Sequence, residues 1–440
     1  MGRAPRGLPP SASEAVHRLT ALPGYTPAVP FMAAALLLLP AVGAGAIVAA
    51  APLAAGNFRA WPVLTVNHLA TLGWATLTAM GALHQLAPAM LGISARPGRQ
   101  ALAQGCLVLV GLAVLAVGFL TRRQGVLVAG GLVVWAGIAC FVWLLARLVP
   151  RRRRWPLPGF GVAASLGYLV ATASWGVVLT INWRWPFWLH LLGVAGIGTH
   201  VALGVVGWLV QLVVSVSYYL LPRFVGARPL DQGRLPAVLG LLNAGVVVLV
   251  VAALAQWGAG ARAGVAVLAA SSALYAADLW RWLQATRGEK PDLTIQHWWV
   301  IWAQTVVLVV VGGAWALGWA AVAPHRLAVA AGILVLLGWV TLAIMGQLYK
   351  VTPFLMWFYR YARGLSALEV PRLPASYYPR EGRLPFYASA AGGAALAAGV
   401  LVRAPHLAVA GATVFCAGAV AFSLFMAVSW MRAALRGTVS

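Results

Sequence analysis

The sequence has few charged residues. Only 9% of its 440 residues are Asp, Glu, Lys or Arg, and only seven of them are acidic. A soluble domain has about 25% charged residues. The scarcity of carboxylates argues against a proton relay built from acidic side chains. Because 62% of the residues are apolar, one soluble core cannot enclose them, and we expect lipid to be the solvent.

Cysteine is also rare, and no paired arrangement of cysteines is present. Cys106, Cys140 and Cys416 each stand alone in an apolar run. This excludes a CxxC redox motif, a CxxCH site for covalent haem and a disulfide framework. Walker loops and nucleic-acid motifs are missing too. The net charge of +24 could suit nucleic acid, but the basic residues lie in short gaps between apolar runs, so we expect no nucleic-acid partner.

Long apolar runs dominate the chain. A helix that spans a bilayer needs about 20 apolar residues. We therefore expect an all-α polytopic membrane protein with about twelve spans. They are Val29–Leu53, Pro62–Leu91, Ala101–Leu120, Val126–Leu148, Phe160–Ile181, Pro186–Leu221, Leu235–Gln256, Ala263–Leu283, His297–Ala320, Leu327–Thr352, Leu384–Val402 and His406–Trp430.

The distribution of basic residues predicts the orientation in the membrane. Of the 31 Lys and Arg residues, seven lie in one alternate set of gaps, and the remaining 24 lie in the other set or in the termini. Cytoplasmic segments hold the excess of basic residues in membrane proteins. We therefore expect both termini on the cytoplasmic side of the inner membrane. The Arg clusters, such as 151–154, then serve as topology determinants.

The same reasoning divides the chain into segments. Residues 1–28 form a polar N-terminal tail, and residues 29–434 form the membrane domain. The longest gap, 353–385, is rich in Arg, Pro and Tyr and is expected to be a cytoplasmic loop. No gap is long enough for a soluble domain.

An internal repeat links the second, sixth and tenth spans. LGWATLTAMGALHQLAP at 72–88 matches LGWVTLAIMGQLYKVTP at 337–353 without gaps, with nine of 17 positions identical at an offset of 265. A weaker copy at an offset of 134 keeps Gly207, Trp208 and Pro222. The glycines allow close helix approach, and the prolines are expected to mark the inner helix ends.

One copy of this motif occurs in every four spans. We therefore expect three pseudo-symmetric four-helix arcs, at about 29–150, 158–285 and 295–434. Most twelve-helix transporters instead have two six-helix repeats.

This pattern resembles the catalytic subunit, subunit I, of haem-copper oxidases, especially the cbb-type oxidases and nitric oxide reductases. The resemblance covers the helix count and three helices in detail. It implies twelve helices in a pseudo-three-fold arrangement, with metal ligands on the second, sixth, seventh and tenth spans. It also implies a place in a respiratory chain.

Two histidines fall near the ligand positions that the resemblance implies. His68, five residues before Gly73, is the candidate axial ligand of a haem b iron or ligand of a copper ion. His200, seven residues before Gly207, is a weaker metal-ligand candidate, because its register is shifted by about two residues. Imidazole is the commonest ligand of protein-bound haem and metals. Each side chain could instead be a histidine hydrogen-bonded within the bundle.

The remaining histidines have simpler interpretations. His84 aligns with Tyr218 and Tyr349 in the other repeats and is interpreted as a polar residue near the inner interface. Five more are interpreted as solvated or interfacial: His17, His190, His297, His325 and His406.

Several ligands of the family are missing. The seventh span, Leu235–Gln256, contains no histidine, and Ala331 and Ile333 occupy the two ligand positions of the tenth span. Neither side chain can bind iron. We therefore expect no complete binuclear oxygen-reducing centre.

Three hypotheses remain open. The first is a divergent haem-copper-oxidase-like protein that binds a b-type haem or copper and transfers electrons, with other respiratory-complex subunits or a cytochrome c as partners. The second is a cofactor-free accessory or assembly subunit on the same scaffold. The third is a twelve-helix secondary transporter.

Overall fold

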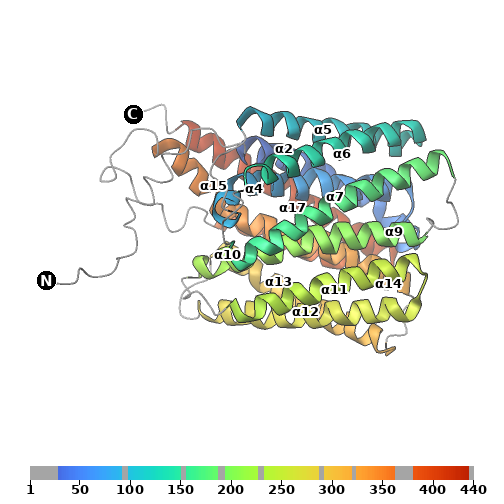
Figure 1. The fold of residues 1–440 in the computed structure, drawn as a ribbon. Helices are drawn as coiled ribbons and strands as arrows, with labels where there is room; N and C mark the ends of the chain where they lie inside the picture. Colours follow the sequence, from blue (N-terminus) through green and yellow to red (C-terminus); the bar gives the residue numbers. More distant parts are fainter. Residues whose placement is uncertain are drawn as a thin grey trace.

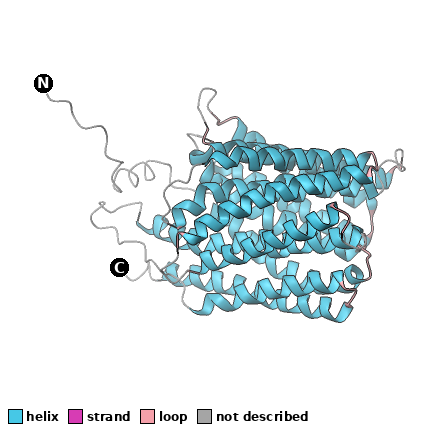
Figure 2. Cartoon of the chain, turned by 90° about the horizontal axis from the view of Figure 1, so that it is seen from below, coloured by secondary structure: helices cyan, strands magenta, loops and turns pink. Residues whose placement is uncertain are grey.

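The computed structural model describes residues 28–91, 98–149, 155–186, 194–225, 232–286, 292–319, 324–361 and 380–435. In these ranges every regular element is a helix and no strand occurs (Figure 2). The long helices run side by side along one direction (Figure 1). This is the architecture of a polytopic membrane protein.

Nine of the expected spans are single helices in the described residues. They are α2 (Ala28–Ala54), α5 (Gly98–Thr121), α6 (Gln124–Ala146), α7 (Leu157–Arg184), α11 (Leu235–Leu254), α12 (Gly258–Gln284), α13 (Leu293–Ala316), α16 (Arg383–Leu401) and α17 (Pro405–Leu435).

The second, sixth and tenth spans are built differently. Each is an α-helix, then a π-helical segment, then another α-helix. The second is α3 (Trp61–His68), η1 (Leu69–Thr76) and α4 (Leu77–Met90); the sixth is α9 (Val194–Val201), η2 (Ala202–Val210) and α10 (Gln211–Phe224); the tenth is α14 (Pro324–Ile333), η4 (Leu334–Val340) and α15 (Thr341–Tyr361).

Eleven helices within the described ranges are long and apolar enough to cross a membrane. The twelfth expected span, Trp61–Met90, is equally continuous but is not among them. Its polar side chains, which include His68 and His84, account for its lower hydropathy. The prediction of about twelve spans therefore agrees with the helices present.

The repeat prolines do not end their helices at once. Helix α4 continues past Pro88 to Met90, α10 past Pro222 to Phe224, and α15 past Pro353 to Tyr361. A proline removes one backbone donor, and neighbouring groups in a bundle can compensate for the loss. The loop expected at 353–385 is therefore shorter than predicted, because residues 354–361 are helical and α16 begins at Arg383. Residues 362–379 lie outside the described ranges.

Three helix pairs share one kind of turn. Helices α5 and α6, α11 and α12, and α16 and α17 pack closely as hairpins. Among the described residues, the non-glycine residues with positive φ are Arg122, Gln256 and Arg403, at 57°, 52° and 58°. One lies in each of these turns, and the N–H of the following residue donates to a carbonyl five residues earlier. This is the hydrogen bond of a Schellman-type helix end.

Packing between the hairpins and the other helices is also regular. Helix α17 packs against α2, α6 against α7, and α12 against α13. Each contact therefore joins the last helix of one predicted repeat to the first helix of a repeat.

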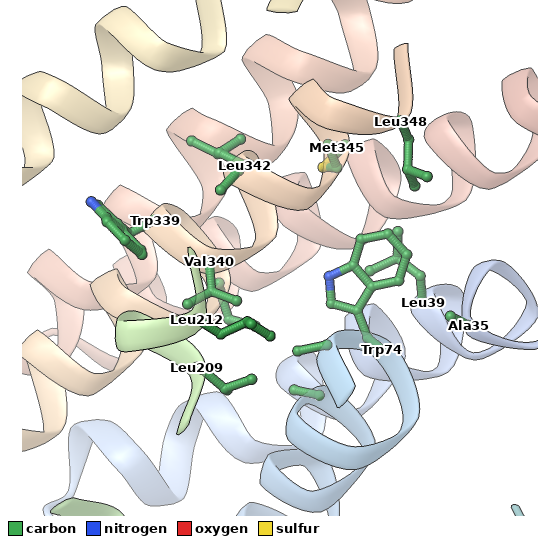
Figure 3. Close-up of a cluster of buried hydrophobic side chains, with 14 of the residues drawn as sticks. Ala35, Leu39, Trp74, Leu209, Leu212, Trp339, Val340, Leu342, Met345 and Leu348 are labelled. Carbon is green, nitrogen blue, oxygen red and sulfur yellow. The ribbon is translucent and has the colours of Figure 1, made fainter. Parts of the chain in front are cut away.

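The three π-helical segments meet in the interior. Segments η1, η2 and η4 contact one another, and each contains the Gly-Trp pair of the repeat. Figure 3 shows Trp74, Leu209 and Val340, one from each segment, in the same buried cluster. A π-helical turn inside an α-helix is rare and is frequent at functional sites. The sequence repeat therefore corresponds to the centre of the bundle.

Candidate functional site

The three repeat tryptophans are buried and donate hydrogen bonds to threonines on other helices. Trp74 Nε1 donates to Thr341 Oγ1 at 3.2 Å, and Trp208 Nε1 donates to Thr76 Oγ1 at 2.9 Å. Thr76 and Thr341 are equivalent in the repeat, each two residues after its tryptophan. The second span is therefore tied to both the sixth and the tenth.

Trp339 departs from this pattern. Its Nε1 donates to Thr305 Oγ1 on α13 at 2.9 Å. The residue of η2 that corresponds to Thr76 is Val210, which has no hydroxyl group. The third indole therefore has its acceptor on another helix.

The repeat glycines make close approach possible. An added Cβ would lie 3.0 Å from both Leu112 and Leu38 at Gly73, 2.6 Å from the Tyr168 ring at Gly207 and 2.9 Å from the Gln304 amide at Gly338. Leu112 lies on α5, whereas Leu38, Tyr168 and Gln304 lie on α2, α7 and α13, the first helices of the three predicted repeats. The close packing predicted from the glycines is confirmed at all three positions.

The two candidate ligand histidines face each other near the π-helical segments. His68 ends α3 and directly precedes η1, and His200 lies in the last turn of α9 before η2. Their imidazole centroids are 6.2 Å apart, with 29° between the ring planes. Both side chains are half-buried between helices. Residues 132 positions apart are thus brought together.

A hydrogen bond to the backbone determines which nitrogen of His68 remains available to a metal. Its Nδ1 lies 2.7 Å from the Leu64 carbonyl oxygen. A carbonyl only accepts, so Nδ1 must hold the proton and Nε2 is left as the potential ligand atom. Metal-binding histidines usually donate their second N–H in this way, which orients the ring.

His200 is held against α7. An added Cβ at Gly176 would lie 3.0 Å from His200 Cε1, so the ring uses space that a larger residue would fill. His200 Nδ1 is buried and has no hydrogen-bond partner. A buried polar atom without a partner costs free energy unless a ligand or water satisfies it.

The spacing of the two rings allows one ion to reach both. Metal–nitrogen bonds are about 2 Å long, so two nitrogens bound to one ion are at most about 4 Å apart. The 6.2 Å between the ring centroids allows one nitrogen of each ring to come within that distance.

Aromatic rings and a cavity lie beside His68, toward the N-terminal end of α3. Phe119 packs on His68 at 4.9 Å between centroids, and Trp61 packs on Phe119 at 6.3 Å and on Trp183 at 5.8 Å. A cavity of about 370 Å³ adjoins this group. It is lined by Arg59, Trp61, Leu64, Gln124, Asn182, Trp183 and Pro186. Because Leu64 accepts the His68 hydrogen bond, the cavity lies one helical turn from that ring.

The other histidines agree only in part with the sequence interpretation. His325 and His406 are exposed at the starts of α14 and α17, as predicted. His297 lies near the start of α13, as predicted, but it is not solvated: its side chain is 0% exposed and packs between Tyr349 and Phe386. His84 is 1% exposed, so other helices enclose its side chain. His17 and His190 lie outside the described residues.

The sequence missed one buried charge cluster. Asp278 on α12 accepts a 2.6 Å hydrogen bond from Tyr218 and pairs with Arg234 at 3.3 Å. Arg281, three residues after Asp278 on α12, is farther away, at 4.0 Å. Ser217 and Tyr275 are hydrogen-bonded beside this cluster at 2.8 Å. The Tyr218 contact could not be read from spacing, because its partner lies on another helix.

The missing ligand positions stay apolar. Ile333 is 9% exposed and packs in the interior. In the described ranges, no three His, Cys, Asp or Glu side chains are grouped so that they could hold a metal ion. The candidate site in this part of the chain thus consists of the His68–His200 pair.

Comparison of the chain with models of protein families gives no match. A search of curated proteins gives no match either. Any functional assignment therefore depends on the chain's own residues and their geometry.

Proposed function

We propose that this protein is an integral membrane electron-transfer protein, divergent from subunit I of haem-copper oxidases, whose redox metal is bound by His68 and His200. The metal is one b-type haem iron or one copper ion. When bound, it supplies one-electron chemistry. The single observation that supports this most is the facing pair of imidazoles at 6.2 Å, with one donor atom of His68 left free and one nitrogen of His200 buried without a partner.

The proposal includes three four-helix arcs around a common axis. The repeated helix contacts, the three positive-φ turns and the three touching π-helical segments support it. The hydrogen bonds Trp208–Thr76 and Trp74–Thr341 also follow one direction of rotation, from the sixth span to the second and from the second to the tenth. This arrangement favours the oxidase-like scaffold over a transporter with two six-helix repeats.

Electron transfer is proposed rather than oxygen reduction. Reduction of oxygen in the family needs further ligands on the seventh and tenth spans. Here α11 contains no histidine, and Ala331 and Ile333 occupy the other two positions. His68 and His200 can hold and orient one metal, and the surrounding Phe119 and Trp61 limit its exposure to water.

The proposed setting is the inner membrane, with both termini in the cytoplasm. On this orientation His68 and His200 lie in the outer half of the bilayer, near the cavity beside Arg59 and Trp183. An electron donor would approach from that side. We propose a cytochrome c or another subunit of a respiratory complex as the partner, with lipid around the apolar helices.

An absorption spectrum with metal analysis tests this proposal. The protein purified in mild detergent is expected to contain one equivalent of haem iron, with a Soret band, or one equivalent of copper. His68→Ala and His200→Ala should each remove it. His325→Ala and His406→Ala, at exposed positions, are the matched controls and should leave it unchanged.

The outcomes separate the alternatives. Retention of the metal in both His68→Ala and His200→Ala would exclude this pair as the site. A colourless wild-type protein without iron or copper, even after expression with added haem precursor and copper, would favour the cofactor-free accessory subunit.

A further inference from the structure

One position differs from its two repeat counterparts in the inner half of the bundle. His84 corresponds to Tyr218 in the second repeat and to Tyr349 in the third. Both tyrosines are satisfied, since Tyr218 donates to Asp278 at 2.6 Å and Tyr349 donates to the Gly382 carbonyl at 2.8 Å. His84 is 1% exposed, and neither of its ring nitrogens has a hydrogen-bond partner. Both ring nitrogens are therefore buried without a well-formed hydrogen bond.

The surroundings of His84 contain a soft donor. Met80 lies four residues earlier on α4 and is 0% exposed, so its side chain is on the same helix face. Gln104 of α5, also fully buried, donates to Met80 Sδ at 3.3 Å, and its Oε1 has no partner. Gln104 also lies close enough to the imidazole to interact with it, although neither ring nitrogen has a hydrogen bond of good geometry.

Aromatic rings enclose this group. Phe31 of α2 lies 5.5 Å from the His84 ring and Phe141 of α6 lies 5.2 Å from it, between centroids. Neither ring can donate or accept a conventional hydrogen bond. A thioether, an imidazole and an amide thus lie next to one another in an apolar shell formed by four helices.

This donor set selects among metals. Thioether sulfur is a soft ligand that favours Cu(I), and imidazole binds copper well. All three donors are neutral, so the ion's charge is not compensated in the apolar interior. A monovalent ion therefore costs less here than a divalent one.

We propose that Met80 and His84 bind one Cu(I) ion, with the Gln104 amide oxygen as a weaker third ligand. The site is distinct from the His68–His200 pair, which lies beyond η1 on the same span. Binding forms metal–ligand bonds only and changes no oxidation state. Binding gives one buried nitrogen of His84 a partner. At the equivalent positions of the other two repeats, the tyrosine hydroxyls already have hydrogen-bond partners.

Titration with Cu(I) in competition with bicinchoninate tests this site. The full chain is used in detergent, in a His68→Ala/His200→Ala background that removes the other proposed ligands. One Cu(I) per chain is expected, with a copper–sulfur path in X-ray absorption. Met80→Leu should weaken binding by about tenfold or more, and His84→Tyr should abolish it.

The repeat supplies the controls. Met345 is the counterpart of Met80 and is equally buried, so Met345→Leu should bind Cu(I) like the background protein. His84→Tyr installs the residue found in the other repeats, and circular dichroism confirms its folding. Unchanged stoichiometry and affinity in His84→Tyr, or a spectrum without sulfur, would overturn the proposal. The two proposals can fail separately. The wild-type spectrum and the His68 and His200 variants test the His68–His200 site, and the Cu(I) titration in the double-alanine background tests only the Met80–His84 site.

Discussion

The indole nitrogen of Trp208 donates a 2.9 Å hydrogen bond to the hydroxyl of Thr76, across 132 positions of sequence. Both side chains are at most 2% exposed. The bond joins η1 and η2, the segments that follow His68 and His200 in the two spans. A hydrogen bond between two buried side chains restrains how these helices rotate relative to each other.

Thr76→Val is expected to destabilise the protein. The valine keeps the volume but leaves the Trp208 N–H buried without an acceptor, which costs about 1–3 kcal/mol. Thermal unfolding in detergent measures the change. Thr71→Val is the control, because the Thr71 hydroxyl bonds only to the Asn67 carbonyl of its own helix. Equal melting temperatures for both variants would contradict a structural role for the Trp208 bond.

A second substitution pair tests the three-fold arrangement itself. Thr305→Val removes the acceptor of Trp339 and is expected to cost about 1–3 kcal/mol. Val210 occupies the position equivalent to Thr76 and Thr341, which accept from the other two repeat tryptophans. If the three arcs are related by rotation, the hydroxyl of Val210→Thr can accept from Trp339. The double variant should therefore regain part of the lost stability. A double variant no more stable than Thr305→Val would count against the rotation.

Gly176→Val should disturb the candidate metal site without touching a ligand. The new side chain would collide with His200, whose Cε1 already lies 3.0 Å from the position of a Cβ. We expect a lower metal content and a shifted absorption spectrum. Gly167→Val, on the same helix with no atom within 4 Å of its added Cβ, is the matched control. An unaltered spectrum in Gly176→Val would show that the His200 ring position is unimportant.

The Asp278 cluster predicts a graded loss of stability. Asp278→Leu leaves the Tyr218 hydroxyl buried without its acceptor and should cost about 1–3 kcal/mol. Asp278→Asn keeps an acceptor oxygen and should cost less, because Arg234 and Arg281 are partly exposed. Urea or thermal unfolding distinguishes the two. Equal losses in the two variants would mean that the charge, which both remove, and not the hydrogen bond to Tyr218, holds the cluster.

Asp292 supplies the comparison at the surface. Its carboxylate pairs with Lys350 at 2.8 Å and accepts from the Ile295 N–H at the start of α13. Asp292→Asn keeps the cap and removes only the half-exposed ion pair, so it should cost no more than about 1 kcal/mol.

The proposed orientation predicts which turns react with reagents outside the cell. In a background without Cys106, Cys140 and Cys416, Gln256→Cys is expected to react with a membrane-impermeant maleimide in intact cells. Arg383→Cys should react only after permeabilisation. Both positions are exposed, so the reverse labelling pattern would invert the topology.

The sequence predicted the helices well because lipid imposes a simple rule on length and hydropathy. The repeat glycines also predicted close packing correctly, since Gly207 receives the Tyr168 ring and Gly338 the Gln304 amide. These features depend on local composition. Their physical causes act within one span or between spans that share a motif.

The contact between His68 and His200 was harder to predict from the sequence. Whether two histidines on separate helices meet depends on helix rotation, and η1 and η2 change that rotation without an established sequence signal. The same holds for the acceptor of Tyr218, which lies on α12. His84 gave a signal, since its counterparts are tyrosines, but its isolation from partners emerges only from the packing.

The π-helical segments have a consequence for how this chain tolerates insertions and deletions. A π turn contains one residue more than an α turn, and each residue of an α-helix advances the helix by about 100°. Deleting one residue from η1 would convert the π turn into an α turn and leave His68 facing the same way, because the π turn takes up the extra residue. Deleting one residue from α4 would also leave the hydropathy profile almost untouched, but it would rotate everything before it, His68 included, by about 100° around the axis.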